Sequence, residues 1–267
     1  MNTVLLIGSH PRHYYLAKKL YDAGFLQGLL VETRAAFMPA PPQGIPLLDK
    51  DNFIRHFTDR MNAERNAFGA DGEESIFPAV PVLSVHPEEL NHAATRAWLS
   101  SLGADTAISY GIHKVDEETL QALPKRAWNI HGGLSPWYRG NITLFWPFYF
   151  LKPNWAGMTI HQLTQRLDGG NIIHHSVPEL ARGDGIHDVA CKAVKQAGED
   201  LVRLLQMVEA GVEPVPVPQK SSGKLFTSTD WTPQHLRLIY NTFDNDIVDR
   251  YLDGELGHQA PPLVKAF

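Results

Sequence analysis

Cysteine is almost absent from this sequence. The 267-residue chain contains a single cysteine, Cys191, which excludes a disulfide framework and a zinc site made of thiolates alone. Cys191 lies within a run of apolar residues at helical spacing, where a thiol is expected to be a small, unreactive core residue.

Long apolar segments and a targeting signal are also missing. No apolar run approaches the roughly 18 residues that a membrane-spanning helix needs, so no membrane partner is expected. Residues 1–7 (MNTVLLI) have neither the basic flank nor the length of a secretory signal peptide. These absences predict a cytoplasmic protein.

The chain also lacks an excess of positive charge. Lys and Arg number 24 against 29 Asp and Glu, a formal net charge of -5, which argues against a nucleic-acid partner. Hydrophobic residues make up 43% of the chain and charged residues 20%, an ordinary globular mixture. At roughly 150 residues per domain, the length predicts one large domain or one domain with an appendage.

The N-terminal segment predicts a strand, a helix and a second strand. Residues 4–7 form a short apolar run typical of a strand buried on both faces. The helix is expected to begin at Pro11, which suits a first turn, and to stop at Gly24, before a second apolar run at 29–31. A β-α-β start requires a crossover connection. The sequence therefore predicts a doubly wound α/β fold with a mostly parallel sheet.

Helices and strands are expected to alternate along the rest of the chain. We predict a loop at 33–48, helices at 51–68, 87–102 and 186–210, and strands at 106–108, 128–131, 158–163 and 172–177. The apolar stripe of helix 51–68 is expected to contain Phe53, Ile54, Phe57 and Met61. In the aromatic run 144–150, Pro147 is expected to kink a buried helix.

The composition changes after Gly211. Residues 212–218 are rich in proline, which predicts an extended segment. Short helices are expected to begin at Thr232-Pro233 and to span 244–252. We therefore divide the chain into a main domain, 1–210, and a small C-terminal extension, 211–267.

A glycine loop follows the strand predicted at 128–131. Because side chains alternate along a strand, Asn129 and His131 share one face. An amide and an imidazole at the carboxyl end of a strand lie where α/β sheets bind ligands, and Gly132 and Gly133 leave room for a substrate. Taken alone, such a pair is more often structural than catalytic, and the turn at Asp168 indicates by itself only a turn.

Together, these motifs resemble the formyltransferase family that uses 10-formyltetrahydrofolate. The order and spacing that carry the resemblance are Asn129-Ile130-His131, Pro136, Gly140, Gly157-x-Thr159 and Leu167-Asp168-x-Gly170-x-Ile172-Ile173. The resemblance covers roughly residues 80–210. It departs at Gly133-Leu134-Ser135-Pro136, where family members commonly carry Ser-Leu-Leu-Pro. This difference affects the substrate pocket rather than the catalytic positions.

The resemblance implies a Rossmann-like formyltransferase core whose catalytic residues are Asn129, His131 and Asp168. Formyl transfer to an amine passes through a tetrahedral intermediate with an oxyanion, to which Asn129 and a protonated His131 can donate hydrogen bonds. Asp168 beside His131 would raise the pKa of the imidazole, orient the ring and take up a proton. No metal is needed for this chemistry.

The resemblance also implies where the donor binds: 10-formyltetrahydrofolate is expected against Tyr110, Gly111 and Ile112 and against the loop Arg166, Leu167 and Asp168. The residues themselves, rather than the resemblance, suggest contacts to the acceptor at Ser9, His10, Arg12, His13, Gly132 and Gly133. The first four of these residues open a helix, whose N–H groups, together with Arg12, would suit a phosphate or another acidic group. Ordinary helix capping explains that loop equally well.

The acceptor is the open question. A nucleotide-linked amino sugar is favoured, because the acidic chain and its short extension argue against aminoacyl-tRNA. Glycinamide ribonucleotide formyltransferases are typically shorter, and formyltetrahydrofolate hydrolases usually carry an N-terminal regulatory domain. Remote alternatives are a folate-binding relative without turnover and a zinc-dependent deacetylase. The deacetylase is suggested by His10-Pro11, but Arg12 and His13 replace its two aspartates. The oligomeric state stays open, with a homodimer as one option.

Overall fold

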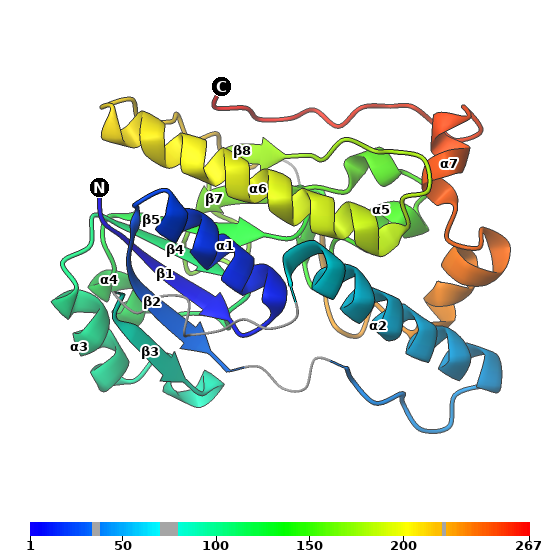
Figure 1. The fold of residues 1–267 in the computed structure, drawn as a ribbon, viewed down its shortest axis with the longest axis horizontal. Helices are drawn as coiled ribbons and strands as arrows, with labels where there is room; N and C mark the ends of the chain where they lie inside the picture. The colour runs from blue at the N-terminus through cyan, green and yellow to red at the C-terminus, as the bar shows by residue number, and fades with distance from the viewer. Residues whose placement is uncertain (34–37, 70–79, 221–222) are drawn as a thin grey trace.

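A seven-stranded sheet forms the centre of the computed structural model (Figure 1), which describes residues 1–33, 38–69, 80–220 and 223–267. The order is β3-β2-β1-β4-β5-β7-β8. The strands are β1 (Thr3–Gly8), β2 (Leu26–Glu32), β3 (Val82–Val85), β4 (Thr106–Tyr110), β5 (Arg126–His131), β7 (Met158–Gln162) and β8 (Ile172–Ser176). β7 pairs antiparallel with both β5 and β8, and the other strand pairs are parallel. The predicted mostly parallel sheet is confirmed.

Helices cover both faces of the sheet, and strand alternation determines which side chains meet them. Leu5 and Ile7 of β1 pack in one apolar cluster with α1 (Pro11–Asp22) and α6 (Ile186–Glu209), which lie in front of the sheet in Figure 1. Val4 and Leu6 pack in a second cluster on the opposite face, with α3 (Ala93–Ser101) and the region of α4 (Glu117–Ala122). Such two-sided burial confirms the doubly wound α/β fold.

The strand order places several strand ends at one edge. β1 lies between β2 and β4, so successive crossovers leave β1 in opposite directions. In α/β sheets, the crevice outside the carboxyl ends of strands at such a point is where ligands bind. Ile7 pairs with Tyr110, and Tyr110 with Ile130. The ends of β1, β4 and β5 therefore lie side by side.

The C-terminal extension packs onto this core. β9 (Lys224–Phe226) pairs with β6 (Tyr138–Gly140), and Val217 pairs with Ile172 at the edge of β8. The end of the chain then runs back beside β8 (Figure 1), where the main-chain N–H of His175 donates to the carbonyl of Val264 at 2.8 Å. The extension thus covers a sheet edge that would otherwise present unpaired main-chain groups.

Helices outside the core complete the chain. α2 (Leu47–Phe68) packs against α1 and α6, α5 (Trp146–Tyr149) contacts the extension, and α7 (Ile247–Leu252) belongs to the extension. Short helical turns are η2 (Pro87–Glu89), η3 (Pro153–Trp155), η4 (Pro233–His235) and η5 (Leu238–Thr242). Among the described residues, no helix is long and apolar enough to cross a bilayer.

Some predicted helix details were wrong. The helix expected at 87–102 is the turn η2 followed by α3, because the carbonyl of Glu89 accepts bonds from the His92 N–H and the Thr95 hydroxyl. Pro147 lies in the first turn of α5, where it has no N–H to lose, so it does not kink a longer helix. Ile54 is 43% exposed, whereas Phe53 is buried in an apolar cluster against which Phe57 packs.

Other boundaries also differ from the sequence-based expectations. The helix predicted from Asp51 begins four residues earlier, at Leu47. Residues 34–37 of the loop predicted at 33–48 lie outside the described part of the chain. The helix expected after Thr232-Pro233 is divided into η4 and η5.

Three buried histidines are held neutral by the fold. Burial lowers the pKa of His175 to about 4 and that of His187 to about 3, and it lowers the pKa of His56 well below its usual value. The Nε2–H of His175 donates to the Ser135 carbonyl at 2.9 Å, and its Nδ1 accepts from the Val264 N–H at 2.9 Å. Only a neutral imidazole satisfies both contacts.

We expect the protein to lose stability as the pH falls below about 6.5. Because the folded pKa values are depressed, the unfolded chain binds protons that the folded chain does not. The contribution of these histidines to the free energy of unfolding is complete above the pKa that they have in the unfolded chain. It is lost as the pH falls toward the pKa that they have in the folded chain. At His175, the change from 6.5 to about 4 corresponds to about 3 kcal/mol.

Thermal unfolding between about pH 7.5 and pH 5 measures this loss. His175→Gln keeps a donor toward Ser135 and removes the titrating ring, so its Tm should decline less steeply with acid than that of the wild type. Equal slopes for the two proteins would show that His175 does not cause the acid sensitivity.

Candidate active site

The carboxyl end of β5 presents the predicted amide and imidazole. Asn129 and His131 project from the same face of the strand, while Trp128 and Ile130 are buried on the other. β7 runs antiparallel beside β5 and places His161 directly opposite Asn129. His161 and Asn129 are therefore cross-strand neighbours, and their side chains lie 3.1 Å apart, from Nε2 to Nδ2.

The turn after β7 brings Asp168 to these residues. Its Oδ1 lies 3.4 Å from Nδ1 of His131 and 3.7 Å from Nε2 of His161, and its Oδ2 accepts the main-chain N–H of Gly140 at 2.8 Å. Asp168 has a positive φ of 46°, in the left-handed region that aspartate tolerates better than most residues other than glycine. The structure thus brings together all three residues predicted to be catalytic.

The Asp168 turn is also held by the C-terminal extension. The side-chain amide of Gln219 donates to the carbonyl of Asp168 at 2.8 Å and to that of Gly170 at 2.7 Å. One side chain therefore satisfies two main-chain acceptors on either side of Gly169 and restrains the turn that carries the carboxylate.

The net pKa of His131, beside Asp168, differs from the sequence-based expectation. Burial lowers the pKa of His131, and the Asp168 carboxylate and the Tyr138 carbonyl offset only part of that effect. Asp168 raises the pKa as predicted, but the net pKa is lowered, because the ring is 6% exposed and loses more hydration than one carboxylate returns. Burial opposes ionisation of Asp168 too, but His131, His161 and the Gly140 N–H outweigh it and hold its pKa at about 2.

His131 is fixed between two acceptors. Its Nε2 donates to the Tyr138 carbonyl at 2.7 Å, and its Nδ1 faces Asp168. A Cβ on Gly133 would come within 2.9 Å of Nε2 and 2.5 Å of the Tyr138 oxygen. Glycine at this position therefore lets the loop close over the ring.

The orientation of the Asn129 amide follows from its neighbours. The Ser109 hydroxyl donates to Oδ1 of Asn129 at 2.7 Å, which fixes the oxygen and directs the NH₂ group toward His161. One N–H of that group meets Nε2 of His161, and the amide has a second N–H to offer. Because Asn129 lines a cavity, this N–H is a candidate donor to a ligand oxygen.

A cavity of about 250 Å³ lies against these residues. Its lining includes every residue for which a donor contact was predicted: Tyr110, Gly111, Ile112, Arg166, Leu167 and Asp168. Asn129, His131 and His161 also line it. The end of β4 and the turn after β7, which are far apart in the sequence, therefore line one cavity beside the catalytic candidates.

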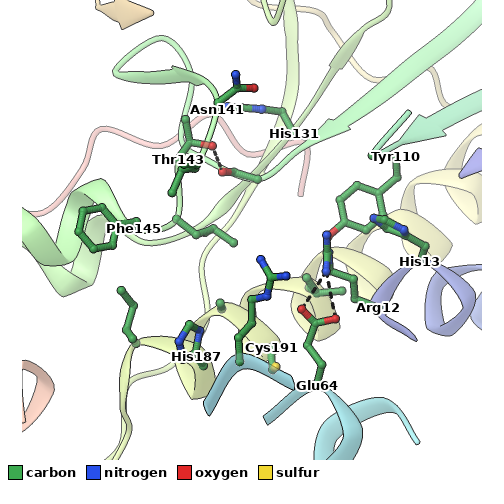
Figure 2. A pocket seen from close by; sticks show the side chains of 18 of the residues that line it. Arg12, His13, Glu64, Tyr110, His131, Asn141, Thr143, Phe145, His187 and Cys191 are labelled. Atoms are coloured by element: carbon green, nitrogen blue, oxygen red, sulfur yellow. Dashed lines mark hydrogen bonds and ion pairs between the residues drawn. The ribbon is translucent and has the colours of Figure 1, made fainter. Parts of the chain in front are cut away.

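A second cavity, of about 380 Å³, shares six lining residues with the first: Tyr110, Gly111, His131, Gly132, Gly140 and Asn141. Figure 2 shows it between His131, the Arg12–Glu64 pair and His187. The two cavities share His131, so that ligands in each would face the same imidazole.

Only some of the residues predicted to contact the acceptor line this second cavity. Arg12, His13 and Gly132 line it, whereas Ser9, His10 and Gly133 are outside its lining. Both oxygens of Glu64 accept from Nη1 of Arg12, at 2.8 and 3.0 Å. The fixed positive charge expected at Arg12 is therefore already matched by a buried carboxylate that is 5% exposed.

Several residues of the second cavity were missed in the sequence. His56, Arg60 and Glu64 come from α2, and His187 comes from the first turn of α6. Polar residues along one face of a helix resemble an ordinary solvated face, so only the packing of α2 against α6 shows that they enclose a cavity. His161 could have been found, since two antiparallel strands ending near one site place their polar residues side by side.

Cys191 is buried, as expected, but it also lines the larger cavity. Burial, together with the nearby carboxylates of Glu64 and Asp188, raises the pKa of its thiol to about 12. The thiol is therefore unreactive at neutral pH. No group of three or more His, Cys, Asp or Glu side chains suited to a metal lies within the described parts of the chain.

Comparison with known proteins assigns the chain to a family. Residues 61–205 match the model of the formyl transferase family. The methionyl-tRNA formyltransferase of Anaeromyxobacter sp. (strain K) is 28% identical over 200 residues, which cover 71% of this chain and 62% of that protein. The chain thus spans less than two thirds of this relative.

Solved structures share the fold at low sequence identity. The phosphoribosylglycinamide formyltransferase of Anaplasma phagocytophilum is 16% identical with a TM-score of 0.55, covering 85% of this chain and 97% of its own. An N-formyltransferase of Helicobacter canadensis, in complex with folinic acid and dTDP-3-aminofucose, is 14% identical with a TM-score of 0.53, covering 87% and 73%. At such identities these likenesses establish the fold only.

Proposed function

Because its match to the family model covers more than half of its length, the chain belongs to the formyl transferase family, and we propose that it moves a formyl group from 10-formyltetrahydrofolate to a primary amine. The observation that carries this proposal is the meeting of two cavities at His131, beside Asn129 and Asp168. One cavity would hold the donor and the other the acceptor. Residues 1–210 form the catalytic domain in this proposal, with 211–267 as an extension that braces it.

The side chains suit the bonds that change. The acceptor nitrogen bonds to the formyl carbon, the bond from that carbon to the folate nitrogen breaks, and a proton passes from the first nitrogen to the second. The second N–H of Asn129, which lines the smaller cavity, would stabilise negative charge on a ligand oxygen there. His131, neutral because of its burial, can take up a proton and share it with ionised Asp168.

The smaller cavity suits the donor. It is lined by the end of β4 and the turn at 164–168, and reaches both Asn129 and His131. The folinic acid bound to the Helicobacter canadensis relative supports a reduced folate as the ligand. When bound, the donor supplies the formyl carbon, and the role of this chain is to place Asn129, His131 and Asp168 around that carbon.

We favour a nucleotide-linked amino sugar as the acceptor. The larger cavity, of about 380 Å³, has room for a sugar beside His131, and the same Helicobacter canadensis relative binds dTDP-3-aminofucose. The sequence relative from Anaeromyxobacter makes aminoacyl-tRNA the competing acceptor. The net charge of -5 opposes it, because nucleic-acid binding depends on neutralising phosphates with Lys and Arg.

A turnover assay tests the proposed function. The full chain is incubated with 10-formyltetrahydrofolate and a panel of UDP- and dTDP-linked amino sugars, and tetrahydrofolate release and product mass are measured. We expect release only when an amine is present, with a product heavier by one formyl group. A chelator should leave the rate unchanged.

Three outcomes would contradict the proposal. Release of tetrahydrofolate without any amine would indicate a hydrolase, and no release with any amine would indicate a binding protein. Loss of activity on chelation, together with stoichiometric zinc in the purified protein, would instead support metal-dependent deacetylation.

A further inference from the structure

The C-terminal extension reaches the catalytic candidates through an extended segment. Prolines on either side of Val217 favour extended backbone, and Val217 exchanges main-chain hydrogen bonds of 2.8 Å with Ile172 of β8. This bridge is antiparallel, so Gln219, two residues further on, falls opposite Gly170. The register therefore places the Gln219 side chain at the turn that carries Asp168.

Gln219 holds this turn through one amide. Its Nε2 donates to the carbonyl of Asp168 at 2.8 Å and to that of Gly170 at 2.7 Å. Within the turn itself, the Gly169 N–H donates to the Arg166 carbonyl at 3.0 Å. The Gln219 amide thus ties the turn to the extension at two points, one of which is the main chain of the residue that carries the carboxylate.

The extension also fixes the main-chain partner of the Asp168 carboxylate. β6 pairs with β9, and Gly140 lies opposite Phe226. The Gly140 N–H donates to Oδ2 of Asp168 at 2.8 Å, and the next N–H, that of Asn141, donates to the Phe226 carbonyl at 2.9 Å. A Cβ on Gly140 would lie 2.1 Å from that carbonyl oxygen, so glycine permits the close pairing. The carboxylate is therefore held from two sides by segments that the extension fixes.

Gln219 acts at a distance from both cavities. It is not among the described residues that line either of them, so its effect on a bound ligand passes through Asp168. Oδ1 of Asp168 lies 3.4 Å from Nδ1 of His131. Because the attraction between a carboxylate and a protonated ring weakens with distance, a turn that is free to move would weaken this pair.

We infer that Gln219 is a positioning residue for formyl transfer: by holding the carbonyls of Asp168 and Gly170, it keeps the Asp168 carboxylate beside His131 while the imidazole takes up and passes on a proton. This inference rests on the proposed function. It makes the extension a part of the active-site scaffold, in addition to a cover for the sheet edge.

The pKa of His131 tests the inference without turnover. The Asp168 carboxylate raises that pKa against the effect of burial, so a displaced carboxylate lowers it further. We expect Gln219→Leu to lower the pKa of His131 in the same direction as Asp168→Asn, by a smaller amount. NMR titration of the imidazole signals of the full chain measures the shift, and the spectrum of His131→Gln identifies the signal of His131.

Turnover should fall with the same substitution. Gln219→Leu removes two neutral hydrogen bonds, so we expect kcat to drop roughly tenfold. The KM values for donor and acceptor should change by less than about twofold, because no ligand contact is lost. Gln219→Lys keeps donors that can reach both carbonyls and should retain more of kcat than Gln219→Leu does. If Gln219→Leu does not fold, Gln219→Ala makes the same comparison.

Gln27→Leu is the matched control. The Gln27 amide likewise donates to a main-chain carbonyl distant in the sequence, that of Leu102 at 2.7 Å, and Gln27 lines neither cavity. This variant should lower Tm and leave both kcat and the pKa of His131 unchanged. The inference is overturned if folded Gln219→Leu protein keeps the pKa of His131, if Gln219→Lys is no better than Gln219→Leu, or if Gln27→Leu lowers kcat equally.

Failure of this inference is distinguishable from failure of the proposed function. If amine formylation occurs but Gln219→Leu leaves kcat and the pKa of His131 unchanged, the proposed function stands and Gln219 does not position Asp168. If no amine is formylated but Gln219→Leu lowers the pKa of His131, the placement of Asp168 by Gln219 stands and the formyl transfer is refuted.

Discussion

His131→Ala should lower kcat for formyl transfer by about 10²-fold or more. The imidazole lies 3.4 Å from Asp168 and borders both cavities. Its removal therefore abolishes proton uptake at the place where donor and acceptor meet. Steady-state kinetics with saturating donor measure the effect, and Tm reports whether the variant is folded.

The matched comparison for His131 is His174→Ala. His174 is another buried histidine of the same sheet, and it lies near Asp200, with its Nε2 3.3 Å from Oδ2. Losing it should reduce Tm and leave kcat nearly unchanged, because His174 does not line either cavity. Near-normal turnover by folded His131→Ala protein would refute the catalytic assignment.

Asn129→Ala should lower kcat by roughly 10²-fold, since one donor to the developing negative charge disappears. The expected change is in kcat rather than in the donor KM, because such a donor acts mainly in the transition state. The same kinetic assay separates the two constants.

Ser109→Ala tests how the amide of Asn129 is positioned. The Ser109 hydroxyl fixes Oδ1 of Asn129 at 2.7 Å, so its loss lets the amide rotate while both of its groups remain. We expect a smaller fall in kcat than for Asn129→Ala. A fall confined to KM in both variants would show that Asn129 binds the ligand and does not assist the chemistry.

Local sequence patterns predicted most of the fold. The apolar run at 4–7 and the proline at 11 are short-range signals, and the structure confirms the strand and the helix they indicate. The same holds for α6, whose apolar spacing predicted its extent to within one residue. Pro147 was misjudged, because a proline that opens a helix and a proline that bends one look alike in sequence.

The residues of the candidate site that lie on strands could be predicted from the sequence. The residues that are brought together by the packing of helices could not. Asn129 and His131 share a face by alternation alone, and the sequence motif added Asp168. The direction of the His131 pKa shift was missed, because it depends on how completely the ring is buried. The role of Arg12 was missed because its partner, Glu64, lies on a different helix.

Gln219 makes the C-terminal extension difficult to exchange between relatives. Its single amide holds the carbonyls of Asp168 and Gly170, so a replacement segment must bring its own double donor to the same point. A chimera joined after residue 210 would otherwise inherit an intact core sequence with an unrestrained carboxylate. In this chain, recombination after residue 210 would separate the Asp168 turn from the side chain that restrains it.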